Sequence, residues 1–328
     1  MMNPCSRAAG FSLVELMVSL ALGLLILAGM LDAFNSNSAT GTTNVRYAEV
    51  QTNGRYAIDF MRRELQHAGF LGLQSIGSPG LDATTIRKNG STGSITSDGC
   101  DTAGFVTKIE WPIWGANNAN ALTCTGMNYL TGSGDVLVLR RAGLQKLTGA
   151  PVANTLYVRS ELSRATVYLG SAQPAVAVRP GETYTPEDYP LRTDVYYISP
   201  YTNSSSESPN IPALYRLRLG ADSTIAMTPE LIATGIENIQ VQYGIRAAGG
   251  GMSYVNAASV ANTDWPNVVA VKIWLLARST DAEYSGFINK TAYTLGDQTY
   301  NPGGLSGGSV IGDHFVRQPF TLVVQLRK

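Results

Sequence analysis

Glu15 is the residue whose type and position most clearly imply chemistry, because it is a carboxylate at the head of an apolar run. The run from Phe11 to Leu31 would form a helix about 31 Å long, enough to cross a hydrocarbon core of about 30 Å. Glu15 is the only ionisable side chain in the run, and a lone carboxylate in hydrocarbon is costly unless it is paired or protonated. If the chain is cut after Gly10, Phe11 gains an α-amino group. Glu15 can then neutralise the amine of its own chain or that of a neighbouring subunit.

An ordinary signal anchor that tolerates one Glu near the interface is the alternative interpretation of this segment. Gly10, however, directly precedes the apolar run, whereas a secretory cleavage site follows the apolar region. Cys5 also precedes the run, which argues against lipoprotein processing. Residues 1–10 therefore form a short leader ahead of the apolar run.

The segment from Gly10 to Glu15 resembles the cleavage motif of type IV prepilins and type II secretion pseudopilins. The resemblance implies that a membrane-embedded prepilin peptidase cuts after Gly10 and methylates the new amino-terminal Phe11. It also implies that Glu15 guides assembly by pairing with the terminal amine of a neighbouring subunit.

Further segments resemble PilW-type minor pilins, and the two beyond residue 230 more distantly resemble the J-type minor pseudopilin. They are Asn53–Ala57, Arg62–Leu65, Gly69–Phe70, Leu231–Gly244 and Trp265–Ser279. The resemblance implies a structural minor pilin in the priming or tip complex of a type IV pilus, where it supports pilus assembly, twitching motility and attachment. The implied partners are other minor pilins, the major pilin and the prepilin peptidase, and the resemblance allows for a PilY-type adhesin. The protein would span the inner membrane once, with its amino terminus in the cytoplasm, before it enters the pilus at the cell surface.

A J-type pseudopilin of type II secretion is the alternative within this superfamily, and a membrane-anchored periplasmic enzyme or binding protein is the alternative from another class. Gly304 to Gly308 matches the G-x-S-x-G nucleophile elbow, with His314 nearby, but the elbow needs a preceding strand and a following helix. The sequence indicates neither, and 34 glycines make a chance match easy. No enzymatic activity is therefore expected.

Metal and cofactor sites have few candidate ligands in this sequence. With only two histidines and two cysteines that are expected to be bridged, a zinc site lacks a good ligand set, so no metal or cofactor is expected. Calcium in an acidic loop around Asp297 or Asp313 stays open as an alternative. Trp111 to Trp114 is expected to anchor a partly buried loop, with an exposed carbohydrate contact as its alternative.

Charge and cysteine content indicate the compartment. The formal net charge is zero, with 24 basic and 24 acidic residues, so nothing indicates a nucleic-acid partner. Arg7 precedes the apolar run and no Lys or Arg occurs from Ala8 to Val45, which places the leader in the cytoplasm and the rest outside. Cys5 would leave with the leader, so Cys100 and Cys124 are expected to form a disulfide in an oxidising compartment, the alternative being two free buried thiols.

Helix periodicity is visible in the amino-terminal part after the apolar run. A polar stretch at residues 35–44 predicts a frayed or bendable section that could still be helical in a packed assembly. Helix periodicity returns up to Ala68, with Gly69 and Gly72 as stop signals. The face expected to pack on a sheet is formed by Ala57, Phe60, Met61, Glu64, Leu65 and Ala68.

Beyond residue 72 the periodicity changes to two, which is typical of strands. The expected strands lie in residues 135–140, 194–199, 215–219, 239–246, 268–278 and 320–326, separated by loops that include residues 199–210 and 301–312. The predicted fold is α+β and, by resemblance, type IV pilin-like, with a long amino-terminal helix packed on an antiparallel, β-rich carboxy-terminal domain. The expected divisions are the leader at residues 1–10, the helix at 11–72 with its transmembrane half at 11–31, and the globular domain at 73–328.

Overall fold

A computed structural model describes residues 10, 12–76, 86–89, 100, 103–162, 164–176, 184–219, 227–246, 250–283 and 286–326. The chain separates into two compact units, residues 1–48 and residues 49–328. The expected leader lies outside the described residues except for Gly10, and Phe11 lies outside them as well.

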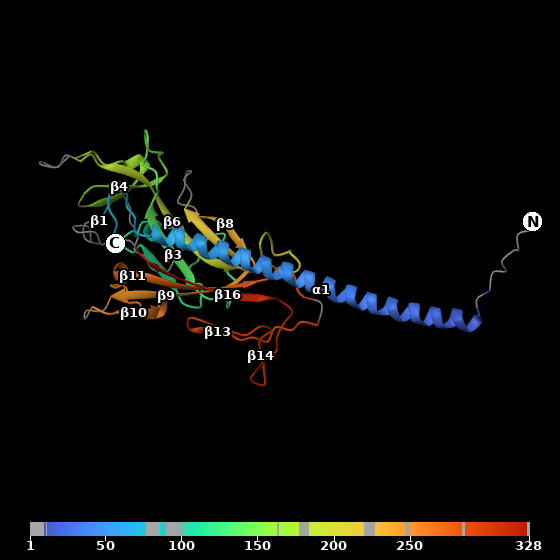
Figure 1. The fold of residues 1–328 in the computed structure, drawn as a ribbon. Coiled ribbons are helices and arrows are strands. Elements are labelled where there is room, and N and C mark those ends of the chain that lie inside the picture. Colours follow the sequence, from blue (N-terminus) through green and yellow to red (C-terminus); the bar gives the residue numbers. More distant parts are fainter. Residues whose placement is uncertain are drawn as a thin grey trace, which may run out of the picture. The chain divides into compact units, whose positions relative to one another are not determined.

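The first element, α1, runs from Leu13 to Gln66 and belongs to both units (Figure 1). Ser12 directly precedes it and Glu15 follows three residues later, the spacing of a capping box. The backbone N–H of Leu16 donates the first helical hydrogen bond to the carbonyl oxygen of Ser12, at 3.1 Å. Leu, Met and Ala, which favour helix, dominate the residues that follow.

The polar stretch at residues 35–44 is helical in the structure, so the expected fraying is not observed. Two of its hydroxyl groups donate to carbonyl oxygens four residues earlier. Thr40 donates to Ser36 at 2.9 Å and Thr42 donates to Ser38 at 3.1 Å. Side chains of this kind compete with helix only when their hydrogen bonds favour other backbone conformations. Here the bonds lie along the helix.

Helix α1 ends at Gln66, six residues before the expected boundary at residue 72. The N–H groups of His67 and Ala68 bond to carbonyls three residues back, and Gly69 then adopts a positive φ of 77°. Glycine tolerates this left-handed conformation, which ends many helices. The N–H of Gly69 donates to the carbonyl of Arg140, so the chain joins a strand immediately after the turn.

In the described part of the chain, the remaining elements are a short α-helix, three single-turn 3-10 helices and sixteen strands, several of only two to four residues (Figure 1). The α-helix and the strands are β1 Ile86–Asn89, α2 Ala103–Val106, β2 Ile113–Ala116, β3 Val136–Ala142, β4 Leu156–Ser160, β5 Ala165–Leu169, β6 Glu187–Ser199, β7 Ala213–Leu219, β8 Met227–Thr234, β9 Ile236–Arg246, β10 Met252–Asn256, β11 Val268–Arg278, β12 Tyr293–Leu295, β13 Gln298–Tyr300, β14 Leu305–Ser306, β15 Ser309–Val310 and β16 Arg317–Gln325.

All six predicted strands are present, and the loop at residues 200–212 is confirmed. The other predicted loop, at residues 301–312, contains the short hairpin of β14 and β15.

The strands form two main sheets and two small hairpins. One sheet has eight strands, in the order β1-β5-β4-β6-β3-β2, with β7 paired to β6 and β8 paired to β7. The other has four strands in the order β10-β9-β11-β16. Pairing is antiparallel, as expected, except that β1 runs parallel to β5. The fold class is therefore α+β, with a long amino-terminal helix and a largely antiparallel β-rich unit.

The carboxy-terminal half of α1 packs into a hydrophobic core with the four-stranded sheet and one face of the eight-stranded sheet. Ala57, Met61 and Leu65 are fully buried there, together with Leu139 of β3 and Ile273 of β11. The predicted buried face of the helix is confirmed. A second core lies on the opposite face of the eight-stranded sheet and includes Val138 and Val195.

Because both faces of the eight-stranded sheet are covered, polar residues of its central strands are buried as well. Arg216 alternates with apolar residues in β7, yet it is only 3% exposed. A similar burial affects Gln240 of β9, which is fully buried and donates its side-chain amide to Gln298 of the β12–β13 hairpin at 2.8 Å. Period-two patterns identify these strands correctly but do not show that these polar side chains are buried.

Trp265 is a central contact of the first core and is 2% exposed. Its ring lies edge-on to Tyr243, with ring centroids 4.9 Å apart, and also contacts the rings of Trp111 and Trp114. The expected anchoring role of the Trp111–Trp114 segment is confirmed, although Ile113 and Trp114 belong to strand β2 rather than to a loop.

Asp135, directly before β3, connects the two sheets. Its carboxylate accepts the backbone N–H of Val241 in β9 at 2.7 Å and that of Asn118 at 2.8 Å. Burial raises the pKa of this carboxyl group to about 7, although these two hydrogen bonds act to lower it. The carboxylate of Asp297 adds a further raising effect.

We expect the stability of the protein to depend on pH through Asp135. A pKa of about 7 in place of 3.8 corresponds to roughly 4 kcal/mol. A carboxyl whose pKa is raised on folding stabilises the fold fully below its unfolded pKa, and this contribution is lost as the pH rises through its folded pKa. The free energy of unfolding of the wild type should therefore fall relative to Asp135→Asn by up to roughly 4 kcal/mol from about pH 4 to about pH 8. Urea unfolding of the detergent-solubilised chain measures this, and equal pH profiles for the two proteins would contradict it.

Candidate assembly site

The amino-terminal unit presents the segment in which the sequence places processing and assembly. Gly10 is exposed and lies outside any helix or strand, and Glu15 is in the first turn of α1. A carboxylate in this position interacts favourably with the positive end of the helix dipole. The hydroxyl of Ser19 donates to the backbone carbonyl of Glu15 at 2.6 Å rather than to its carboxylate. Among the described residues, the Glu15 carboxylate has no hydrogen bond or ion pair.

The apolar side chains of this unit are uncovered. Every Leu, Ile, Val, Met and Phe from Leu13 to Phe34 is more than half exposed. By length and composition, α1 is able to cross a membrane, and its apolar window is entirely unburied. Exposed apolar surface of this extent requires lipid or other apolar helices around it.

The carboxy-terminal half of α1 is held to the sheets by close contacts as well as by apolar burial. Gly54 packs against the ring of Phe320 in β16, at a distance that leaves no room for a Cβ atom. The ring of Phe60 meets that of Tyr196 in β6, edge to face, with centroids 6.3 Å apart. Glu64 accepts a hydrogen bond from Arg141 of β3 at 3.0 Å.

This ion pair could not be identified from the sequence. Helix periodicity places Glu64 on the buried face of the helix, but its arginine partner is 77 residues away. The one available signal is a charged residue in an otherwise apolar stripe, since such a residue requires a partner of opposite charge when it is buried.

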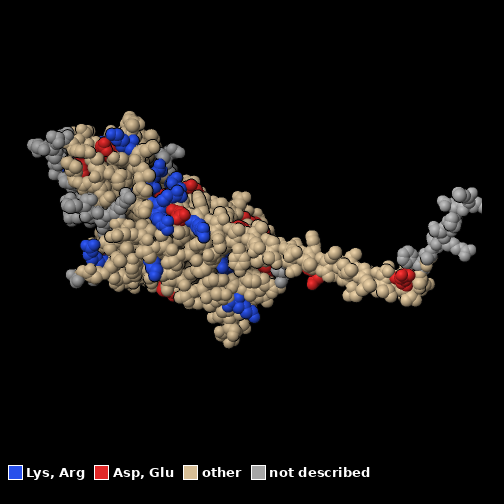
Figure 2. Space-filling view, viewed as in Figure 1, with Lys and Arg blue, Asp and Glu red and all other residues tan. Residues whose placement is uncertain are grey.

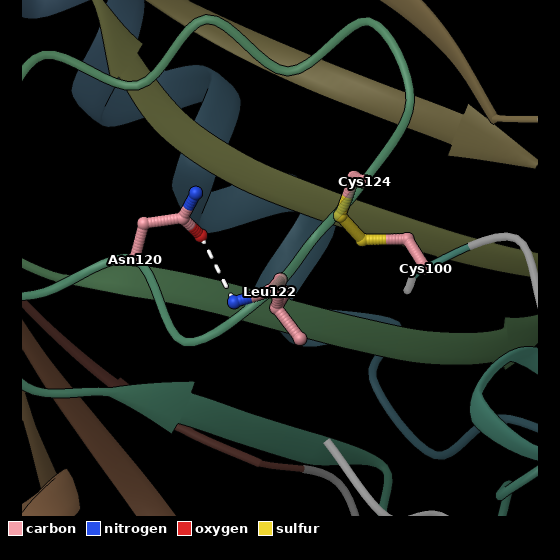
Figure 3. Close-up of a disulfide and its surroundings, with 4 residues drawn as sticks. All are labelled: Cys100, Asn120, Leu122 and Cys124. Carbon is pink, nitrogen blue, oxygen red and sulfur yellow. Dashed lines mark hydrogen bonds between the residues drawn. A yellow bond between two sulfur atoms is a disulfide. The ribbon is translucent and has the colours of Figure 1, made fainter. Parts of the chain in front are cut away.

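The structure contains a disulfide between Cys100 and Cys124, whose Cα atoms are 4.7 Å apart (Figure 3). Both residues belong to the second core, and Cys100 is fully buried. The turn that leads to Cys124 is ordered by the side chain of Asn120, which accepts the backbone N–H of Leu122 at 3.0 Å (Figure 3). The bridge ties the segment before α2 to the loop between β2 and β3.

The G-x-S-x-G segment considered for catalysis lies in a β-hairpin, and Asp313, considered for calcium, lies in an ion pair. Ser306 ends β14, and Gly307 and Gly308 form the turn to β15, so no helix follows the G-x-S-x-G segment. Both carboxylate oxygens of Asp313 accept hydrogen bonds from Arg317. Within the described ranges, no three His, Cys, Asp or Glu side chains are grouped as metal ligands.

Family models match both the amino-terminal and the carboxy-terminal part of the chain. Residues 5–31 match the prokaryotic N-terminal methylation motif, and residues 195–328 match the family PilW, described as Type IV Pilus-assembly protein W. A solved structure, the type IV-like pilin TTHA1219 from Thermus thermophilus, is 15% identical, with 60% of this chain and 79% of that chain covered and a TM-score of 0.26. No curated protein matches the chain.

The pairing of Cys100 with Cys124 stays a prediction that thiol chemistry can test. Without a reductant, neither cysteine of the globular unit should react with an alkylating reagent, and both should react after reduction. Loss of the bridge in Cys124→Ser should reduce the free energy of unfolding by roughly 3 kcal/mol, because the bridge closes a loop of 24 residues. Cys5→Ser is the matched control and should leave unfolding unchanged. Full alkylation of both cysteines without reductant would contradict the pairing.

Proposed function

Since the chain is a PilW-type minor pilin of type IV pili, we propose that it joins other minor pilins in the complex that primes pilus assembly or occupies the pilus tip. In this role it supports twitching motility and surface attachment, and it offers a binding site for a PilY-type adhesin. A pilin acts by assembly, so we infer a structural role without enzymatic activity.

The observation that carries this proposal is the prepilin motif at the head of a helix whose apolar half is wholly exposed. One helix provides an uncovered apolar segment and, further on, a buried stripe that belongs to a folded unit. Such a chain can be held in a membrane by its first half. It can then exchange lipid for the helices of neighbouring subunits without unfolding its globular part.

The processing step follows from the same segment. A prepilin peptidase cuts between Gly10 and Phe11 and methylates the new terminal amine. Before assembly the protein spans the inner membrane once, with its amino terminus in the cytoplasm, and the β-rich unit lies outside. In the pilus, Glu15 pairs with the terminal amine of a neighbouring pilin, and this pair selects the register in which the helices pack.

We predict that the mature protein begins at N-methylated Phe11. Gly10 presents no side chain to the peptidase and is exposed in the structure. Mass spectrometry of protein extracted from membranes should find this terminus, and a strain without prepilin peptidase should retain residues 1–10. An intact leader in cells with an active peptidase would be incompatible with the proposed processing.

We also predict that Glu15→Ala is cleaved normally but is poorly incorporated into pili. In a packed bundle of helices, the neighbouring amine would lose its counter-charge, and breaking one half of a buried pair costs roughly 3–5 kcal/mol. This corresponds to a loss of incorporation by a factor of roughly a hundred to several thousand. Glu15→Gln should be nearly as defective because it keeps the size and removes the charge.

The measurement is the ratio of protein in sheared pili to protein in membranes, in a deletion strain complemented at native expression. Asp32→Asn is the matched control. It removes the next carboxylate along the exposed helix and leaves the first turn unchanged. Full incorporation of Glu15→Ala would show that Glu15 is only a tolerated residue near the membrane interface.

A further inference from the structure

A group of arginines lies on the face of the eight-stranded sheet that α1 partly covers. Strand register places three cross-strand pairs on this face. Arg141 is opposite Arg192, Asp194 is opposite Arg218, and Arg216 is opposite Glu230. We refer to Arg141, Arg192, Arg216 and Arg218 as the arginine face. Figure 2 shows Lys and Arg side chains gathered around fewer acidic ones, near the carboxyl end of α1 in Figure 1.

The buried part of this face is internally paired. Asp194 is 1% exposed and lies 3.6 Å from Arg218 and 4.0 Å from Arg216. Arg216 also contacts Glu230 at 2.7 Å and Glu64 at 3.7 Å. With the Arg141–Glu64 pair, these contacts join three carboxylates to three of the four guanidinium groups, those of Arg141, Arg216 and Arg218.

Arg192 is the arginine of this face whose positive charge has no carboxylate partner among the described residues. No carboxylate of the described residues is within ion-pairing distance of its guanidinium. Burial lowers the pKa of Arg192, and the neighbouring charge of Arg218 lowers it further, against the opposite effect of Asp194. Like charges directly opposite each other on paired strands are destabilising. The pair of Arg141 and Arg192 is of this kind.

Hydrogen-bond donors are also left over. Nε of Arg141, Nε of Arg218, and both Nε and Nη1 of Arg216 are buried without an acceptor. Arg216 itself is 3% exposed. A buried donor without an acceptor is costly, and a guanidinium group matches a carboxylate with two parallel hydrogen bonds. Oδ1 of Asp194 is likewise buried without a hydrogen-bond partner, 3.6 Å from Nε of Arg218 and 4.0 Å from Nε of Arg216, so these ion pairs are not closed by hydrogen bonds. The positive charge without a carboxylate partner is that of Arg192, and an acceptor from outside the chain would match it.

The exposed residues on and near this face show where such an acceptor can bind. Arg218 is 37% exposed and Arg192 is half-buried, so both reach the surface. The last turns of α1 add Arg62 and Arg63, both exposed, beside Glu64 in sequence. The cavities found beside Met252 and beside Arg278 are lined by other residues. The arginine face is therefore not in either cavity, and a bound acceptor would be shielded from solvent by the molecule that carries it.

We propose that the arginine face is a docking site for a carboxylate presented by a neighbouring subunit of the pilus. The proposal rests on the proposed function as a pilus subunit. The incoming Asp or Glu side chain contacts Arg192 and Arg218 and is covered by the surface of its own protein. It supplies the missing negative charge to the arginine face.

Charge reversal tests this site without loss of folding. Arg192→Glu places a carboxylate opposite Arg141, a favourable cross-strand pair, so the membrane level of the variant should be normal. Its incorporation into sheared pili should fall about tenfold or more, because like charges would then meet at the interface. Arg246→Glu is the matched control. Arg246 is an exposed arginine at the end of β9 in the other sheet, and its reversal should leave incorporation unchanged.

A second variant identifies the partner group. In Arg192→Lys, a water-soluble carbodiimide joins the new amine to an adjacent carboxyl group as an amide, with loss of the activated carboxyl oxygen. We expect a cross-link from position 192 to an Asp or Glu of a second pilin, located by mass spectrometry, and none from Arg246→Lys. Normal incorporation of Arg192→Glu would overturn the proposal. A loss of incorporation with no cross-link at position 192 would also overturn it, since Arg192 would then act within its own chain.

Two further results distinguish a docked carboxylate from a bound free anion, and the docking site from the pilus role as a whole. If inorganic phosphate raises the melting temperature of the wild type but not of Arg192→Glu, and no cross-link forms, the arginines hold a free anion and the docking proposal is wrong. If the wild-type chain is itself absent from sheared pili, the proposed function fails. The carbodiimide cross-link in membranes then still decides whether the arginine face meets a neighbouring subunit.

Discussion

The burial of one side of α1, from Val50 to Leu65, is the interaction on which the globular unit depends. This stripe fills the first core with residues of both main sheets, so removing it would expose apolar surface of the two sheets together. Burial at roughly 25 cal/mol per Å² makes such a stripe the dominant stabilising contribution of the helix. Gly54 against Phe320 and Glu64 against Arg141 determine the position of the helix along that core. The helix is therefore part of the domain, and the domain cannot be separated from it at residue 72.

Local pattern was sufficient to predict the helix, the main strands and the amino-terminal motif. The motif occupies six consecutive residues, and the buried stripe of α1 repeats with helical spacing, so both can be identified from one segment of sequence. The antiparallel character of the sheets followed from period-two strands separated by turn residues. The stretch at residues 35–44, predicted to be frayed or bendable but able to be helical, is helical in the structure, where Ser and Thr bond along the helix.

Features that depend on contacts between distant segments could not be predicted in the same way. Arg216 alternates with apolar residues, yet it is buried in contact with Glu64 of α1 and Glu230 of β8. Gln240 is buried because the β12–β13 hairpin lies over it. The parallel pairing of β1 with β5 joins residues about 80 positions apart, with no signal in either segment alone. The arginine face has the same origin, since strand register brings its members together from three strands.

The length of the contact between α1 and the β-rich unit has a mechanical consequence. A fibre under tension transmits force along its central helices, and in this chain that force would enter the globular unit through α1. The attachment is spread over more than four helical turns, from Val50 to Leu65. Its contacts include Phe320 in β16, Tyr196 in β6 and Arg141 in β3. A pull along the helix would therefore load these contacts together as shear, instead of peeling them apart one after another.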